Sequence, residues 1–137
     1  MIKVQNLHKS YGNVEVLKGI NIEIQDGEVL AIIGPSGSGK STFLRCLNFL
    51  EVAEKGIIEI DGVIVNLEKR KKAQISAIRG KTGMVFQSYN LFKNKTALEN
   101  VSEPLRLTKK IAKLEAQKKA YQLLADVGLK GKELNYP

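Results

Sequence analysis

One glycine-rich stretch, GPSGSGKST at residues 34–42, constrains this sequence more than any other feature. It follows an apolar run of five residues, VLAII at 29–33. It precedes apolar residues that recur on one helical face, namely Phe43, Leu44, Leu47 and Leu50. Glycine, four residues, glycine, lysine and serine is the spacing of a P-loop, whose backbone N–H groups cradle phosphates. The sequence therefore predicts a loop that joins a buried parallel strand to the N-terminus of a helix.

The residue types in this loop suit a nucleotide phosphate. Gly34, Gly37 and Gly39 allow backbone conformations closed to residues with a Cβ, so that successive N–H groups turn inward. Lys40 would bring a positive charge to the β and γ oxygens, and the Ser41 hydroxyl would contact Mg²⁺. The alternative is a Gly/Ser-rich surface turn, but that leaves the flanking strand and helix patterns unexplained.

Composition bounds the class of protein. The chain has 137 residues, enough for one ordinary domain. It contains neither an apolar run long enough to cross a bilayer nor the layout of a signal peptide, so we expect a soluble intracellular chain. Cys46 is the single cysteine, and its place in the helix after the loop predicts a buried, inert thiol.

The net charge of +8 comes largely from basic residues at 69–72, which are three lysines and Arg70, and from lysines at 109–119. These clusters could bind nucleic acid or anionic lipid, or they could be the solvated faces of two helices. We favour solvated faces, because no aromatic residues are interleaved for base stacking and no nucleic-acid motif is present.

Secondary-structure patterns change along the chain. Alternating residues at 1–7 and 20–24 predict two paired antiparallel strands, joined by a loop at 8–13 that carries Tyr11. A turn is expected at Asp26-Gly27, and a β-hairpin about Asp61-Gly62. The remaining elements of this part are a basic surface helix within residues 66–79 and a short apolar strand at 82–86.

The rest of the chain has helical periodicity. Thr96 and Glu99 have the spacing of a capping box, and Pro104 should end or bend the helix that they begin. A longer helix should close at Gly128 in a left-handed cap. Its buried face is expected to hold Ile111, Leu114, Tyr121, Leu124 and Val127. We therefore predict a β-rich core at residues 1–87 and the start of a helical subdomain at 88–137.

Several residues together resemble the ATP-binding subunits of ABC transporters. Residues 34–42 are similar to the Walker A motif, Tyr11 to the aromatic residue that stacks on adenine, and residues 83–87 to the strand that leads to the Q-loop glutamine. Residues 43–51 and 90–101 look most like the branch that imports polar amino acids, although Lys93 and Asn94 stand where that branch usually has proline and histidine.

The resemblance implies an α/β fold, a P-loop NTPase core with an antiparallel β-subdomain, and ATP and Mg²⁺ as cofactors. The residues that it assigns to ATP are Tyr11, Gly34, Pro35, Ser36, Gly37, Ser38, Gly39, Lys40, Ser41 and Thr42. It gives Ser41 and Gln87 to the metal. Leu91 and Phe92 are candidates for lining the groove that, in this family, receives a helix of the membrane subunit.

The resemblance also implies an ATPase that drives amino-acid import. Its partners would be a transmembrane permease subunit, a second ATP-binding subunit in a homodimer and, indirectly, an extracytoplasmic solute-binding protein. It would lie in the cytoplasm, peripheral on the inner face of the cell membrane. The resemblance implies no nucleic-acid partner.

The family's signature LSGGQ and Walker B carboxylates do not occur in these 137 residues. We therefore expect the first half of a complete subunit, which binds ATP without turnover and contains no catalytic residue of its own. Without a neighbouring Walker B strand, residues 29–33 would be an apolar edge facing water, which predicts marginal stability or self-association. The alternatives are a non-catalytic nucleotide-binding remnant, a small P-loop kinase and an RNA-binding module.

Overall fold

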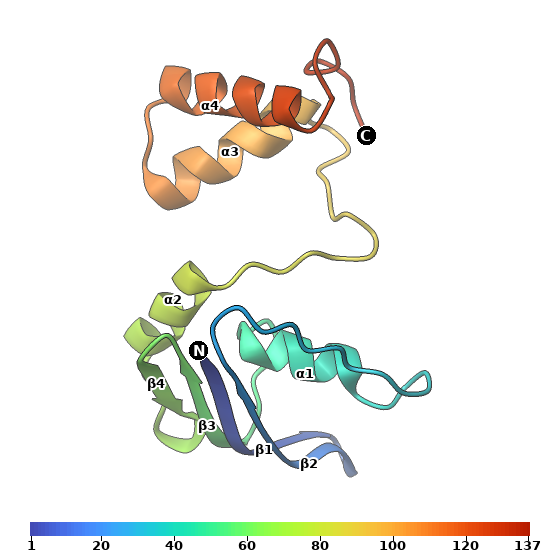
Figure 1. Cartoon of the computed structure of the whole chain (residues 1–137), viewed down its shortest axis with the longest axis vertical. Coiled ribbons are helices and arrows are strands. Elements are labelled where there is room, and N and C mark those ends of the chain that lie inside the picture. The colour runs from blue at the N-terminus through green and yellow to red at the C-terminus, as the bar shows by residue number, and fades with distance from the viewer. The chain divides into compact units, whose positions relative to one another are not determined.

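The computed structural model describes residues Met1–Pro137, which divide into two units, Met1–Met84 and Val85–Pro137. The first contains a four-stranded antiparallel sheet in the order β2-β1-β3-β4 (Figure 1). Its strands are β1 (Ile2–Tyr11), β2 (Val14–Ile24), β3 (Lys55–Ile60) and β4 (Val63–Asn66). Its helices are α1 (Lys40–Leu47), α2 (Lys72–Lys81) and the 3₁₀ helix η1 (Leu67–Lys69).

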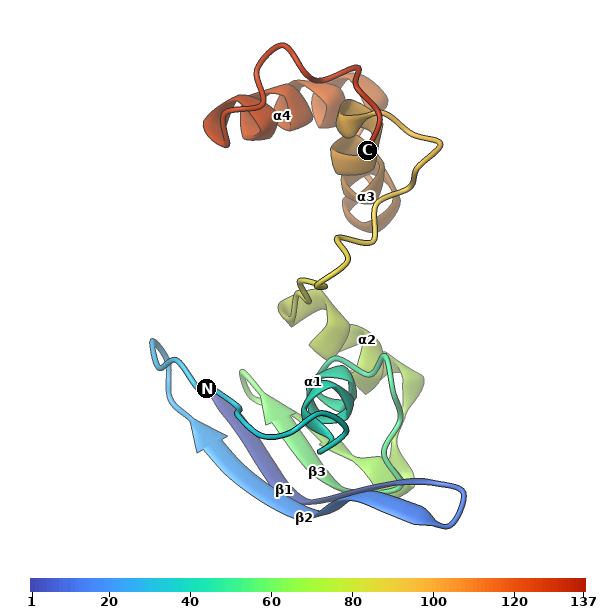
Figure 2. The same cartoon turned by 90° about the vertical axis from the view of Figure 1, so that its right-hand side faces the viewer.

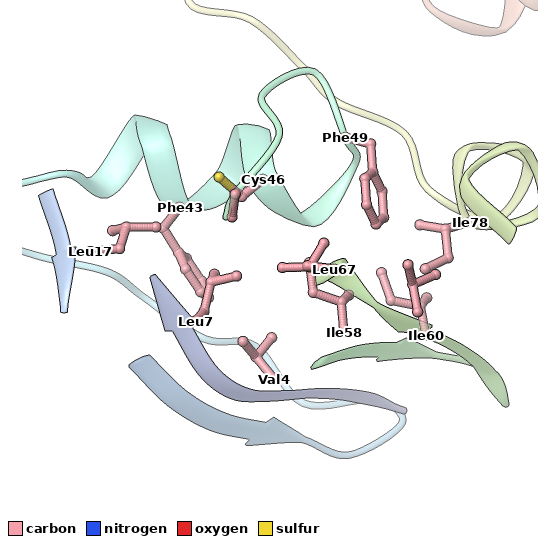
Figure 3. Close-up of a cluster of buried hydrophobic side chains, with 12 residues drawn as sticks. Val4, Leu7, Leu17, Phe43, Cys46, Phe49, Ile58, Ile60, Leu67 and Ile78 are labelled. Atoms are coloured by element: carbon pink, nitrogen blue, oxygen red, sulfur yellow. The ribbon is translucent and has the colours of Figure 1, made fainter. Parts of the chain in front are cut away.

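One face of this sheet is covered by α1 and α2 (Figure 2). Phe43 and Cys46 of α1 pack in a single cluster with Leu7 of β1 and Ile58 of β3 (Figure 3). The alternation that predicted antiparallel strands is confirmed, since β1 pairs antiparallel with both β2 and β3. The hairpin about Asp61-Gly62 is confirmed as well, because β3 and β4 pair on either side of it.

A bulge in β1 decides which side chains face α1. The register of β1 against β2 shifts between Val4 and Leu7, and Asn6 between them has a φ of 49°. A Cβ on Gly56 of β3 would lie 2.9 Å from the Asn6 carbonyl oxygen, so the two backbones approach too closely there for any other residue. The bulge brings both Val4 and Leu7 into the core, and alternation then places Lys9 on the same face as Leu7.

The expected loop at residues 8–13 is wrong. β1 continues to Tyr11, which pairs with Val14 at the start of β2. Only Gly12 and Asn13 form the turn, and Gly12 has the positive φ of 58° that such a tight hairpin requires. Polar residues in this stretch resembled a loop, but both strands extend past the edge of the core and remain hydrogen-bonded there.

Two expected strands do not form. Residues 29–33 and 82–86 have no regular secondary structure, and Val29, Ile33 and Val85 are 95%, 91% and 98% exposed. A parallel strand needs a hydrogen-bonded neighbour, and none of the four strands in the first unit pairs with either segment. The expected exposure of apolar residues at 29–33 is therefore found in this chain, but the expected strands are not.

The second unit contains α3 (Ala97–Lys109) and α4 (Lys113–Asp126). The capping box is confirmed: the Thr96 hydroxyl accepts from Glu99 N–H at 3.2 Å, and the Glu99 carboxylate accepts from Thr96 N–H at 2.8 Å. The next free amides, of Ala97 and Leu98, donate to carbonyls of the C-terminal segment at 2.8 and 2.9 Å. Pro104 does not end α3, which continues through it.

The left-handed cap of α4 is confirmed. Gly128 has a φ of 78°, its N–H donates to Ala125, and the next N–H donates to Leu124. The expected buried face is largely wrong, since Leu114 and Val127 are 75% and 70% exposed. The buried residues are instead spaced four apart and include two alanines: Ala116, Ala120 and Leu124. At 14 residues α4 is the longest helix, and no helix combines the length and apolarity needed to cross a bilayer.

Candidate functional site

The glycine-rich loop at residues 34–42 leads directly into α1, whose first residue is Lys40. Phe43 and Cys46 are buried against the sheet, so the N-terminal turn of the helix is held in place. Leu44 and Leu50, which were expected on the same buried face, are 46% and 52% exposed. The buried Cys46 was predicted correctly, and burial raises the pKa of its thiol to about 11.

Gly39 fastens the loop to the sheet. It has a φ of 91° and precedes α1, where the Phe43 N–H donates to its carbonyl at 2.8 Å. A Cβ at this position would lie 2.9 Å from Cγ1 of Val16 and 3.3 Å from Cδ2 of Leu17. Only glycine therefore permits both the conformation and the close packing of the loop on β2.

Lys40 closes the loop on itself. Its ammonium group donates to the carbonyl oxygens of Gly34 at 2.8 Å and Pro35 at 2.7 Å. The Ser38 hydroxyl lies 3.5 Å from the same nitrogen, and the Ser38 N–H donates to the Pro35 carbonyl at 3.3 Å. The lysine thus holds a positive charge in the concave side of the loop.

A hollow of about 210 Å³ opens between the loop and the first turn of α1. It is lined by Ser36, Gly37, Ser38, Gly39, Lys40, Ser41 and Thr42. No carboxylate is among these residues, and α1 has no acidic residue in its first turn. Backbone amides at a helix N-terminus, hydroxyls and one ammonium group form a donor set that fits a phosphate group. The exposed Ser41 offers the kind of oxygen ligand that Mg²⁺ takes beside phosphates.

A larger hollow of about 360 Å³ lies beside the loop and has a different character. The side chains that line it away from the loop are apolar: Leu17, Ile20, Ile22, Ile32, Ile33 and Phe43. It lies where residues 29–33 leave the apolar face of β2 partly uncovered. It shares Ser38, Gly39 and Lys40 with the smaller hollow, but its remaining side chains are apolar. Because every residue that lines the smaller hollow belongs to the loop or to the first turn of α1, we assign the phosphate there.

Tyr11 lies at the same end of the sheet as this loop. It is the last residue of β1 and pairs with Val14, two residues along β2 from the Val16 that packs near Gly39. Two strand residues span about 7 Å, so Tyr11 lies near the point where the loop packs on β2. The Tyr11 side chain is 45% exposed, so part of its ring is accessible.

Sequence reasoning missed Lys9, whose Nζ lies 4.8 Å from the centre of the Tyr11 ring. The lysine is 8% exposed although it is charged. The signal that could have found it is its spacing: Leu7, Lys9 and Tyr11 follow each other at intervals of two in one strand, and so share a face.

The remaining expected site residues lie in the second unit. Gln87 is exposed in a turn, and Leu91 and Phe92 are 51% and 56% exposed. Leu91 lines a hollow of about 330 Å³ together with residues of α3, α4 and the C-terminal segment. A metal site shared by Gln87 and Ser41 stays a prediction, since these residues belong to different units.

Comparison with known proteins identifies the family. Residues 17–136 match the family model described as ABC transporter. The chain belongs to the ABC transporter family. It is 49% identical, over all of its 137 residues, to the probable amino-acid import ATP-binding protein YxeO of Bacillus subtilis (strain 168). It is 48% identical over its full length to the L-cystine import ATP-binding protein TcyN of the same organism. The chain covers 55% and 53% of these proteins, about half the length of the curated relatives that it matches.

Solved ABC structures have the same fold. The ATP-binding cassette MJ0796, in a dimeric post-hydrolysis state bound to ADP and Pi, matches 99% of this chain at 34% identity with a TM-score of 0.81. The chain covers 61% of that structure. The predicted family and α/β ABC ATPase fold with an antiparallel β-subdomain are therefore confirmed.

Proposed function

We propose that this chain is the nucleotide-binding part of an ATP-binding subunit that couples ATP binding and hydrolysis to amino-acid import. The observation that carries the proposal is the hollow at residues 36–42, with the Lys40 ammonium inside the loop, in a chain 49% identical to an amino-acid import ATP-binding protein. The amino-acid substrate class is inferred from the names of the relatives. Phosphate binding is inferred from the residues of the loop.

The residues of the site take distinct roles in this proposal. Lys40 is held by two neutral carbonyl oxygens, which the anionic oxygens of a phosphate replace favourably. The amides of residues 36–41 and the positive end of α1 receive the phosphates, and the ring of Tyr11 stacks on the adenine. Ser41 would offer its hydroxyl to Mg²⁺, which would neutralise phosphate charge, and the family resemblance adds Gln87 as a second candidate ligand.

The partners and location follow from the same proposal. The subunit works with a transmembrane permease subunit and, indirectly, an extracytoplasmic solute-binding protein. Its second ATP-binding subunit is another copy of itself, and the dimeric state of the ATP-binding cassette MJ0796 supports this arrangement. Such a subunit lies in the cytoplasm, on the inner face of the membrane.

A second candidate is a nucleotide-binding remnant without transport activity. It is favoured by one observation: no carboxylate that could position an attacking water lines the phosphate hollow. We therefore assign no catalytic residue to this chain, and we expect nucleotide binding without turnover from these 137 residues.

The binding step is tested by titrating the chain with Mg-ATP in a calorimeter. Charge-assisted hydrogen bonds contribute about 1.5–3 kcal/mol, so Lys40→Ala should weaken binding about 10- to 150-fold. Lys119→Ala is the matched control, because it removes an exposed lysine that pairs with Glu115 in the second unit. Equal affinities for the Lys40→Ala and Lys119→Ala variants would contradict the site.

The transport role is tested in a chimaera. This chain replaces the aligned residues of TcyN in Bacillus subtilis, and uptake of labelled L-cystine is measured. The proposal expects uptake that Lys40→Ala abolishes. A stable chimaera that binds ATP but supports no uptake would favour the remnant.

A further inference from the structure

Lys9 is a buried cation whose position is fixed by its surroundings. Its ammonium group donates to the Val52 carbonyl at 2.9 Å and to the Glu54 carboxylate at 2.9 Å. The second oxygen of Glu54 accepts from the Ser10 N–H at 2.9 Å, and the Glu54 N–H donates to the His8 carbonyl at 3.1 Å. The end of β1 and the segment before β3 are thereby tied together around one charge.

This lysine keeps its charge at neutral pH. Burial disfavours the ammonium, but the hydrogen bond and charge of Glu54 outweigh burial, so that the pKa of Lys9 lies above its ordinary value. Burial also raises the pKa of Glu54, but its bonds to Lys9 and Ser10 more than offset this and lower it. Both partners are therefore ionised under physiological conditions.

The charged group also contacts an aromatic ring. Lys9 Nζ lies over the ring of Tyr11, 4.8 Å from its centre, which is within the range of a cation–π interaction. A tyrosine that is 45% exposed beside a hairpin turn has several staggered rotamers available. A cation held by Val52 and Glu54 against one face of the ring favours the rotamer that keeps this contact.

We propose that Lys9 is the positioning residue for Tyr11: it holds one face of the ring and leaves the opposite face free to stack on the adenine of the nucleotide. This rests on the proposed function, in which Tyr11 contacts the base. Lys9 does not line the hollow at 36–42, and its hydrogen bonds go to Val52 and Glu54. Its contribution should therefore appear in the binding of the base and not in the binding of the phosphates.

The experiment separates these two contributions with a pair of ligands. Mg-ATP carries both base and phosphates, whereas inorganic tripolyphosphate with Mg²⁺ carries only the phosphates. Affinities for both are measured by calorimetry for the 137-residue chain and for Lys9→Met, Lys9→Gln and Lys9→Arg. The readout is the ratio of the two affinities, which a general loss of folded protein does not change.

Lys9→Met should lower the affinity for ATP about two- to fivefold and leave the affinity for tripolyphosphate unchanged. Lys9→Arg should restore much of the ratio, because a guanidinium group can keep both the ring contact and the Glu54 pair. Lys9→Gln keeps a hydrogen-bond donor for Val52 and Glu54 but removes the charge. It should therefore lower the affinity for ATP as Lys9→Met does, and it provides the same test if Lys9→Met folds poorly.

A double-mutant cycle with the exposed Tyr11 completes the test. In a Tyr11→Leu background, Lys9→Met should have no further effect on the ratio, because the ring through which it acts is gone. An unchanged ratio in both Lys9→Met and Lys9→Gln would overturn the positioning role and leave the proposed function intact. If the unsubstituted chain bound ATP no more tightly than tripolyphosphate, base stacking by Tyr11 would fail and the positioning role with it.

Discussion

Replacing Gly39 by alanine tests how the phosphate loop is held to the sheet. Gly39 has a φ of 91°, a conformation that costs a residue with a Cβ about 1–2 kcal/mol. The new Cβ would also lie 2.9 Å from Cγ1 of Val16, which is shorter than the ordinary van der Waals contact of 3.4–4 Å. Val16 is β-branched and stiff, so relieving this overlap should cost about another 1–3 kcal/mol.

The total of about 2–5 kcal/mol approaches the whole stability of a small unit. Gly37→Ala is the matched control, because Gly37 has a φ of 80° in the same loop but no atom within 4 Å of its added Cβ. Gly37→Ala should lower the free energy of unfolding only by the cost of a positive φ in a residue with a Cβ, about 1–2 kcal/mol. Hydrogen exchange of the β1 and β2 amides gives the local free energy of unfolding for the first unit of each variant.

A second substitution isolates the contact itself. Val16→Ala removes the methyl group that the alanine at position 39 would meet, so the double variant should recover about 1–3 kcal/mol relative to additive behaviour. If Gly39→Ala destabilised the unit no more than Gly37→Ala, and Val16→Ala gave no recovery, the packing of the loop on β2 would be refuted.

Three further perturbations test other parts of the chain. Thr96→Ala should lower the free energy of opening of α3, measured by hydrogen exchange, by about 1 kcal/mol. Thr108→Ala, near the end of the same helix, should lower it less, and equal losses would contradict the capping box. Gly128→Ala should destabilise α4 by about 1–2 kcal/mol because Gly128 has a φ of 78°. Gly80→Ala within α2 should instead stabilise its helix, and a stabilising effect of both substitutions would argue against the cap at Gly128. Burial raises the pKa of Cys46 from 9.0 to about 11, so stability should fall as pH rises through that window, and a Cys46→Ala variant with the same pH profile would oppose this.

The sequence predicted best those features whose signals are local. The Asp61-Gly62 turn, the Thr96 capping box and the Gly128 cap each depend on a few neighbouring residues whose backbone conformations and hydrogen bonds are nearly independent of the rest of the chain. The start of a helix at Lys40 belongs to the same class.

Features that depend on distant partners were predicted less well. Residues 29–33 have the composition of a buried strand, but a strand also needs neighbouring backbone groups, and none pairs with them. The buried face of α4 was misassigned because close packing of helices favours alanines, here Ala116 and Ala120, over the larger residues that a hydrophobicity pattern selects. The burial of Lys9 was not predicted for a related reason. A buried lysine needs a partner for its charge, and that partner, Glu54, is distant in sequence.

Lys40 also supports the half of the loop that follows the irregular residues 29–33. The C-terminal half of the loop is anchored by Gly39 on β2 and by Phe43 in the core. The N-terminal half follows residues without regular structure, of which Ile32 packs against the same core. There the bonds from Lys40 to the carbonyls of Gly34 and Pro35 hold the backbone in its curved form. The same ammonium group is the one proposed to contact the phosphates. In that proposal, nucleotide binding replaces the hydrogen bonds from Lys40 to the Gly34 and Pro35 carbonyls by hydrogen bonds to phosphate oxygens. Under the proposed function, the affinity for ATP should therefore depend on how well the phosphate oxygens replace those two carbonyls in ordering residues 34–38.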